Sequence, residues 1–260
     1  MSKLKIIDTI KRSFIILKED PTIIVLFILP AIFPIKSIIS NYLMFFILSG
    51  TPPDIPSTPP IPFFILFLVV FFLFGVWASA GAILKVTELE KGGKLGLKAT
   101  LSKGLKKIPK LLVPAIVGLA ISILMVAGLT VAITNYPFMR MVSLVQNVGP
   151  YNIVPRLAMG FLFTAGLYVA IRLYLYAPAC VLENNFGLKT SWELVKGNWW
   201  RIFVIFLIFA AMSVIIDQAP VIGRFLSDLI MSPLTITVAT LIYFQLREAK
   251  SPGEEHKESP

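Results

Sequence analysis

Residues 186–201 read FGLKTSWELVKGNWWR and lie directly before an apolar run. Read as one helix, this stretch places four large apolar side chains on one face, at Leu188, Trp192, Val195 and Trp199. The polar and charged side chains fall on or near the other face, at Lys189, Glu193, Lys196 and Asn198. A helix with an apolar face, a basic face and an apolar run behind it is typical of a segment lying flat in the membrane interface.

Two earlier stretches have the same character. Residues 1–20 carry bases and an apolar stripe at Ile6, Ile10, Phe14 and Leu17. Residues 85–110 contain eight lysines and a stripe at Leu97, Leu101, Leu105 and Ile108. Each stretch precedes a long apolar run, so the chain is predicted to contain three amphipathic helices that lie in the membrane interface.

The composition indicates a membrane protein. The 260 residues are 57% hydrophobic and 15% charged, with a mean hydropathy of +0.83, whereas a soluble domain is about half apolar and a quarter charged. We predict six spans, at residues 22–48, 63–84, 111–134, 156–182, 202–216 and 225–246. Pro30 and Pro34 should break the first span, and Pro178 should bend the fourth, because proline removes a helix hydrogen bond.

The predicted fold is an all-α integral membrane protein with a single domain, residues 1–247, and a disordered cytoplasmic tail, residues 248–260. Ser13 aligns without gaps on Ser191, and Gly96 on Gly187, which favours three repeats of one interfacial helix and two spans. The units are residues 1–84, 85–182 and 183–247. The alternative is that basic amphipathic stretches accompany any membrane protein with cytoplasmic loops.

The distribution of bases predicts the orientation. With six spans, 19 of the 24 Lys and Arg residues lie on the side of the amino terminus and 3 lie on the other. Basic loops remain in the cytoplasm, so both termini are predicted to be cytoplasmic in a multi-pass protein of the cell membrane.

One phrase resembles a known family: Pro178 and Glu183, then Gly187-Leu188-Lys189 and Ser191-Trp192, then Gly197-Asn198-Trp199-Trp200. It is similar to the membrane domain fused to some bacterial glycerophosphodiester phosphodiesterases and to its stand-alone YciC-type and archaeal relatives. The resemblance is sharpest over residues 172–209, and Thr190 stands where a smaller residue is expected. It implies a polytopic helical fold of poorly understood function; no phosphodiesterase domain is attached, so that activity is not carried over.

Arg172 is the candidate functional residue, because it lies about ten positions inside the fourth predicted span. A base in mid-membrane costs at least about 2.5 kcal/mol unless it is paired or reaches water. Arg172 could line a polar cavity and meet a lipid phosphate or an anionic solute. It could instead snorkel to the interface, or bond carbonyls freed by Pro178.

The other candidate residues are basic or aromatic and lie in the predicted interfacial helices, where they would contact anionic headgroups: Lys98, Lys103, Lys106, Lys107, Lys189, Lys196, Trp192 and Trp199. Topology alone would also place bases there. Lys36 and Asp228 are predicted to form an intramembrane pair across the first and sixth spans, the alternative being two independent residues near span ends.

The sequence predicts no enzyme, no metal site and no cofactor, since it has one Cys, one His and no catalytic motif. Nucleic acid is not expected as a partner despite the net charge of +10, because the bases flank apolar runs. The first hypothesis is a protein that binds or organises membrane lipid. The alternatives are a channel or transporter with a polar path near Arg172, and a membrane anchor or assembly subunit for another protein.

Overall fold

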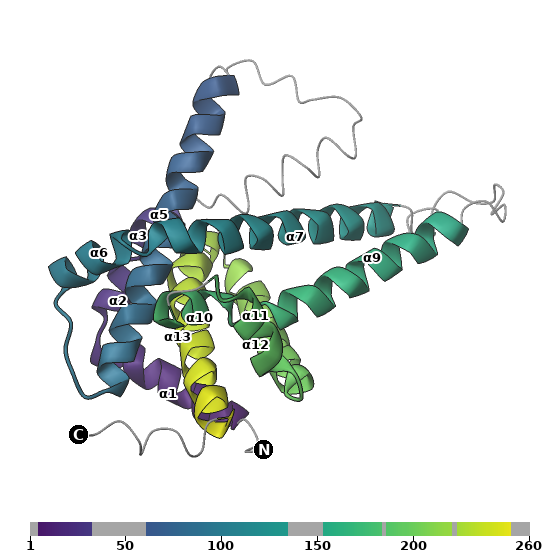
Figure 1. The fold of residues 1–260 in the computed structure, drawn as a ribbon. Coiled ribbons are helices and arrows are strands. Elements are labelled where there is room, and N and C mark those ends of the chain that lie inside the picture. The colour runs from purple at the N-terminus through teal and green to yellow at the C-terminus, as the bar shows by residue number, and fades with distance from the viewer. Residues whose placement is uncertain (1–4, 33–60, 135–152, 184–185, 220–222, 251–260) are drawn as a thin grey trace.

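The computed structural model describes residues 5–32, 61–134, 153–183, 186–219 and 223–250 (Figure 1). Within these ranges every regular element is an α-helix and there is no strand. The helical class predicted from the composition is therefore confirmed for the described part of the chain. The first predicted span lies largely outside it, because only α2 (Thr22–Val25) and α3 (Ile28–Ile32) are described there.

Short helices form in all three stretches predicted to be interfacial. They are α1 (Ile6–Glu19), α6 (Leu97–Leu105) and α11 (Leu188–Val195). The prediction of one helix over residues 186–201 is wrong. Gly197 has φ 92, a conformation that L side chains rarely adopt, and the chain restarts as a new helix at Trp199. Trp199 therefore does not share a helix face with Trp192.

The long helices are α5 (Ile61–Glu90), α7 (Ile108–Thr134), α9 (Ile153–Arg172), α12 (Trp199–Asp217) and α13 (Gly223–Lys250), with the shorter α10 (Tyr176–Glu183) after α9. Four segments of the described chain are long and apolar enough to cross a membrane: Val69–Glu90, Phe163–Glu183, Trp199–Asp217 and Phe225–Lys250. A shorter apolar segment, Ile108–Ile121, lies in α7.

Two of the helix breaks follow from proline. Pro178 lies in the first turn of α10, and the residue four positions before it, Tyr174, lies in the turn between α9 and α10. Pro30 bears the same relation to Leu26, which separates α2 from α3. A proline ring clashes with the carbonyl of the residue four before it. The bend predicted at Pro178 is therefore found as a break in the helix one turn earlier.

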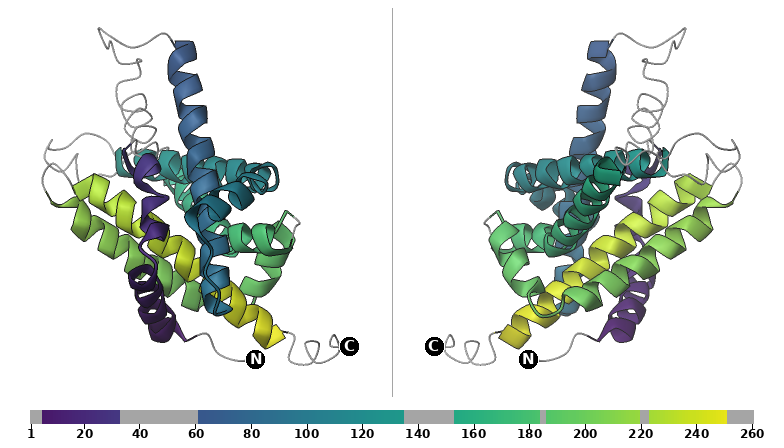
Figure 2. Two further views of the ribbon diagram at one scale, coloured as in Figure 1. Left: turned by 90° about the vertical axis from the view of Figure 1, so that its left-hand side faces the viewer. Right: turned by 90° about the vertical axis from the view of Figure 1, so that its right-hand side faces the viewer.

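The helices pack around a central group. α5, α10 and α13 contact one another, and each short helix packs on one side of this group: α6 on α5, α11 on α9 and α10, and α1 on α13. The pair α7–α9 extends outward from this group, and α12 packs along α13 (Figures 1 and 2). The first and last described helices lie together, because Thr9 of α1 and Gln245 of α13 exchange hydrogen bonds.

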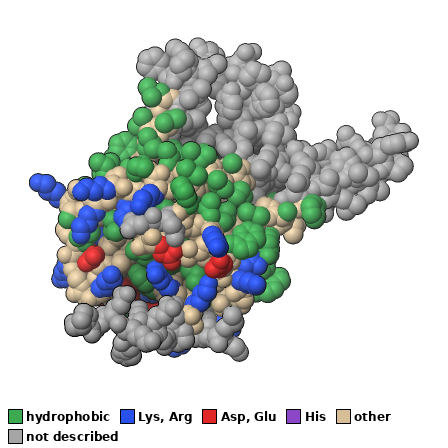
Figure 3. Space-filling model, viewed as in Figure 1, with side chains coloured by type: hydrophobic (Ala, Val, Ile, Leu, Met, Phe, Trp, Pro, Cys, Tyr) green, Lys and Arg blue, Asp and Glu red, His purple; other side chains and the backbone are tan. Residues whose placement is uncertain are grey.

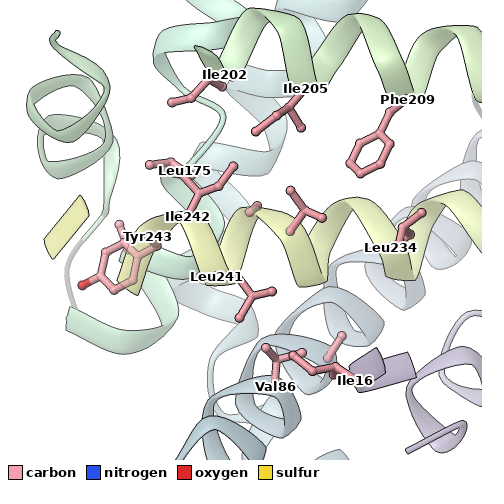
Figure 4. Close-up of a cluster of buried hydrophobic side chains, with 14 of the residues drawn as sticks. Ile16, Val86, Leu175, Ile202, Ile205, Phe209, Leu234, Leu241, Ile242 and Tyr243 are labelled. Atoms are coloured by element: carbon pink, nitrogen blue, oxygen red, sulfur yellow. The ribbon is translucent and has the colours of Figure 1, made fainter. Parts of the chain in front are cut away.

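The largest hydrophobic core surrounds α13 (Figure 4). Leu234, Ile242 and Tyr243 of α13 are fully buried. Side chains from α1, α5, α12 and the turn before α10 meet them, including Ile16, Val86, Leu175, Ile202 and Ile205. A smaller core joins α5, α7 and α10.

Each of the three short helices buries a small polar side chain, and the predicted apolar stripes are buried only in part, at Leu17 and Val195. Ser13, Thr100 and Ser191 are fully buried, whereas Phe14, Leu105 and Trp192 are 42%, 59% and 41% exposed. Small residues allow helix backbones to approach closely. Each stripe therefore has at least one large apolar side chain that is directed outward.

The carboxyl-terminal boundary also differs from the prediction. Residues 248–250, expected to be in the disordered tail, continue α13, and Lys250 pairs with Glu193 of α11 at 3.0 Å. The remainder of the predicted tail lies outside the described residues.

Two threonines within α13 bond to their own helix: Thr237 and Thr240 donate hydrogen bonds to the carbonyls of Pro233 and Ile236.

Candidate lipid and anion interface

The site begins at the break between α9 and α10. Arg172 is the last residue of α9, so it lies at a helix end, within the candidate span Phe163–Glu183 that continues into α10. The Ser191 hydroxyl of α11 fills the break: its Oγ accepts from the Leu175 N–H at 3.1 Å and donates to the Arg172 carbonyl at 2.8 Å. This buried side chain satisfies backbone groups that the break leaves without helical partners, and it fixes α11 against Arg172.

The Arg172 guanidinium is held by neutral groups. Nε and Nη2 donate to the Tyr168 hydroxyl at 3.0 and 2.7 Å, and Nη1 donates to the Trp192 carbonyl at 3.1 Å. The guanidinium carbon also lies 5.2 Å from the Tyr168 ring centroid and 5.1 Å from that of Trp192. Both distances are within the range of cation–π attraction. The carbonyl that Arg172 bonds belongs to α11, and not to the turn before Pro178.

An aromatic cluster continues from this arginine toward α12. The Tyr168 and Trp199 rings are 5.7 Å apart, and Trp199 stacks on Phe203 at 5.3 Å. Trp200 meets Trp199 edge-on and is 69% exposed. The Trp199 indole N–H is buried and has no acceptor among the described residues. The structure thus brings Arg172, Trp192 and Trp199 together, although the last two lie on different helices.

Arg172 lacks the ion pairs that two other described arginines form. Arg12 pairs with Glu19 and Glu90, and Arg247 pairs with Glu183. Arg172 has no carboxylate within salt-bridge distance among the described residues. A guanidinium has five N–H donors, and three of them are used. The remaining donors and the uncompensated charge can serve an anion.

Two predicted lysines flank this cluster on α11. Lys189 and Lys196 are exposed, with Glu193 between them. A hydrogen bond and charge attraction from Lys250 hold the pKa of Glu193 below its usual value, with smaller contributions from Lys189 and Lys196. Glu193 is thereby engaged by α13 and stays ionised at neutral pH, so it lowers the local positive charge without removing it.

The remaining predicted lysines lie on a different helix. Lys98, Lys103 and Lys106 are exposed on α6 or just after it, and Lys107 is half-buried. Because α6 packs on α5 while α11 packs on α9 and α10, these lysines form a second basic region and not part of the Arg172 site. The predicted Lys36–Asp228 pair is untested, since Lys36 lies outside the described residues.

Two polar clusters are absent from the sequence-based prediction. Lys85, assigned to the basic stretch after the second span, is only 3% exposed within α5, and its ammonium donates to Asp20 and to the Thr22 hydroxyl. The signal for a longer α5 is weak, because charged residues interrupt its apolar pattern from Lys85 onward. Lys85 directly follows the predicted span 63–84, and this position in the sequence does not show whether its side chain is buried.

The second cluster joins α10, α11 and α13. Glu183 accepts hydrogen bonds from the Tyr243 hydroxyl at 2.7 Å and from Thr190 at 2.8 Å, and pairs with Arg247 at 3.4 Å. The sequence places Glu183 just after the fourth predicted span, but it contains no signal that Tyr243 and Arg247 of α13 are its partners. This cluster fixes the ends of three helices together.

No group of three or more His, Cys, Asp or Glu side chains capable of holding a metal ion occurs in the described ranges. The chain matches no family model, no curated protein and no solved structure. The geometry of the site is accordingly the basis for any functional conclusion.

Proposed function

We propose that this protein is a non-enzymatic, multi-pass membrane protein that binds anionic lipid headgroups at Arg172. The observation that carries the proposal is a half-buried arginine fixed between two aromatic rings without a carboxylate partner among the described residues. A planar guanidinium donates paired hydrogen bonds that match phosphate geometry. Tyr168 and Trp192 hold it in place in advance, which lowers the entropy lost on binding.

The surroundings of Arg172 favour a lipid over a free anion. Trp192 and Trp200 are exposed beside it, and tryptophan is enriched at membrane–water interfaces. The helix that follows, α12, is one of the four apolar enough to span a membrane. An anion bound here would therefore lie at the level where lipid phosphates lie.

The exposed residues of the short helices support membrane contact at three places. Two of these helices present an exposed lysine, a large apolar residue and a second lysine at the same spacing: Lys11, Phe14 and Lys18 in α1, and Lys189, Trp192 and Lys196 in and just after α11. In α6, Lys98 and the half-buried Leu101 occupy the first two of these positions and Leu105 the third, with Lys106 one residue later. Figure 3 shows Lys and Arg side chains gathered below an area of hydrophobic side chains. Such a boundary fits helices that lie in the interface with apolar side chains toward the acyl region.

We further propose that the chain consists of three repeats closed into a ring. Leu101 and Trp192 each follow the aligned glycines, Gly96 and Gly187, by five residues. The carbonyl of each accepts a hydrogen bond from the preceding long helix, from Trp77 Nε1 at 2.9 Å and Arg172 Nη1 at 3.1 Å. The packing of α1 on α13 closes the ring.

This arrangement predicts a six-span topology with both termini in the cytoplasm. In a background in which the one cysteine, Cys180, is replaced by alanine, Ser57→Cys should react with a membrane-impermeant maleimide added to intact cells. Ser102→Cys on α6 should react only after the cells are lysed. The reverse pattern, or labelling of both positions in intact cells, would contradict this topology.

The lipid proposal predicts that Arg172→Gln loses selectivity for anionic lipid. One basic group near an anionic surface contributes about 1 kcal/mol, so we expect retention of phosphatidylglycerol over phosphatidylcholine to fall about fivefold. The measurement is native mass spectrometry of protein released from nanodiscs containing both lipids. Arg172→Lys should fall between the wild type and Arg172→Gln, because it keeps the charge and loses the paired donors.

Arg12→Gln is the matched control, because Arg12 is also a half-buried arginine but is paired with Glu90 at 2.9 Å. It should leave the lipid preference unchanged. A triple alanine variant at Lys103, Lys106 and Lys107 tests the second basic region in the same assay. Equal retention of both lipids by the wild-type protein would sink the proposal, and so would an Arg172→Gln variant with unchanged preference and unchanged thermal midpoint.

A further inference from the structure

An apolar groove lies between α2–α3, α5 and α6. The side chains that line it include Val25, Leu29, Phe74, Trp77, Leu97 and Leu101. Three of them remain accessible: Val25 and Leu29 are each 47% exposed and Leu97 is 37% exposed. The indole N–H of Trp77 is already bonded to the Leu101 carbonyl at 2.9 Å. The lining therefore has little to offer a polar ligand.

Two lysines without ion-pair partners in the described part of the chain are close in sequence to residues that line this groove. Lys98 falls between the lining residues Leu97 and Leu101 on α6, and Lys94 lies three residues before Leu97. Both lysines are exposed, and neither has a carboxylate within salt-bridge distance in the described part of the chain. The helix α6 thus supplies two apolar lining side chains, Leu97 and Leu101, and a lysine between them in the sequence, Lys98.

We infer that this groove holds one acyl chain of an anionic phospholipid whose phosphate lies at Lys98. The inference rests on the proposed function and names a second binding site for it. Phe74 and Trp77 belong to the candidate span Val69–Glu90, so one wall of the groove is a helix apolar enough to cross a membrane. Lipid tails are as apolar as the groove itself, so the tail contributes close packing and Lys98 contributes the preference for negative charge.

The corresponding position in the next unit has a different chemistry. Trp77 bonds the Leu101 carbonyl of α6 where Arg172 bonds the Trp192 carbonyl of α11. At α11 the cation itself comes from the long helix, and aromatic rings surround it. At α6 the long helix supplies an aromatic wall and the cation comes from the short helix. The two sites therefore bind through different residues and can be tested separately.

Trp77 provides the probe. A variant with Trp192, Trp199 and Trp200 replaced by phenylalanine retains Trp77 as its one tryptophan. It is reconstituted in vesicles of phosphatidylcholine and phosphatidylglycerol at one fixed ratio, with brominated acyl chains placed on one lipid at a time. We expect brominated phosphatidylglycerol to quench Trp77 fluorescence about two- to fivefold more per mole than brominated phosphatidylcholine.

Two pairs of variants identify the groove. Lys94→Gln with Lys98→Gln should equalise quenching by the two lipids, whereas Lys103→Gln with Lys106→Gln should preserve the preference. Leu97→Phe, which narrows the groove, should lower quenching by both lipids. Leu105→Phe is its control, because Leu105 is 59% exposed on the same helix and is not among the residues that line the groove.

Equal quenching by the two lipids in the single-tryptophan protein, or no quenching by either, would overturn the inference. If that protein does not fold, the same quantity follows from the difference between the wild type and Trp77→Phe. If lipid retention depends on Arg172 but the two brominated lipids quench Trp77 equally, the lipid site in the groove is rejected and the proposed function stands. Loss of both would reject the proposed function as well.

Discussion

Replacing Gly187 with alanine is expected to prevent the protein from folding into a stable, monodisperse particle. Gly187 precedes α11 and has φ 67 and ψ −12, in the left-handed region that costs an L residue about 1–2 kcal/mol. A Cβ added there would lie 2.4 Å from the Tyr176 carbonyl oxygen and 2.6 Å from the Cys180 nitrogen. Both atoms are backbone of α10, so they cannot move aside without shifting that helix.

The expected loss of stability is at least about 4 kcal/mol, in the range reached when a core contact and a backbone conformation fail together. It would appear as aggregation on size-exclusion chromatography in detergent and as a large fall in the thermal midpoint. Gly92→Ala is the matched control: Gly92 has φ 77, but an added Cβ would meet nothing within 4 Å. Gly92→Ala should lower the stability only by the cost of a left-handed backbone conformation, about 1–2 kcal/mol. Equal effects of the two substitutions would show that α11 is not packed tightly against α10.

The positions of the short helices could be predicted because their charge pattern is local. Three basic stretches ahead of apolar runs became α1, α6 and α11. Their buried faces could not be predicted by the same reasoning. Hydrophobic periodicity identifies an apolar side such as that of Phe14 or Trp192, and in water this side would be buried. Where helices pack closely, the inner positions require small residues such as Ser13 and Ser191.

The candidate site was predicted in part for a similar reason. Arg172, Trp192 and Trp199 stood out as residue types that are unusual or informative beside apolar runs. Tyr168, which holds Arg172 through its hydroxyl and its ring, did not stand out. Its role depends on the end of α9 and on the position of α11, and both are consequences of tertiary packing. Pro178 indicated that the helix would bend, but not that it would break or that Ser191 would occupy the break.

Replacing Asp20 with alanine is expected to destabilise the protein by about 3–5 kcal/mol, because it leaves the Lys85 ammonium buried without a counter-charge. Lys85 is 3% exposed and donates to Asp20 and to the Thr22 hydroxyl. Asp20 also accepts from the Thr22 N–H at 3.1 Å, where α2 begins. The pair therefore fixes the entry of the first predicted span against α5.

The double variant Asp20→Ala with Lys85→Met is the decisive comparison. Methionine fills the same space without a charge, so most of the loss in Asp20→Ala should be recovered. Glu90→Ala is the surface control, because Glu90 pairs with Arg12 where both side chains are partly exposed, at 31% and 40%. That substitution should cost less than about 1 kcal/mol. A single Asp20→Ala loss as small as this would mean that Lys85 reaches water once Asp20 is removed.

The same pair predicts how stability depends on pH. Burial alone would raise the pKa of Asp20, but hydrogen bonds and charge attraction from Lys85 and Thr22 outweigh it and hold this pKa below the ordinary 3.8. A carboxylate with a lowered pKa stabilises the fold fully above its unfolded pKa and loses that contribution as the pH falls through the folded value. The thermal midpoints of the wild type and of the double variant should therefore differ by a constant amount near neutral pH. Below pH 3.8 the wild type should lose more stability than the double variant, and parallel curves throughout would show that the ion pair does not control this dependence.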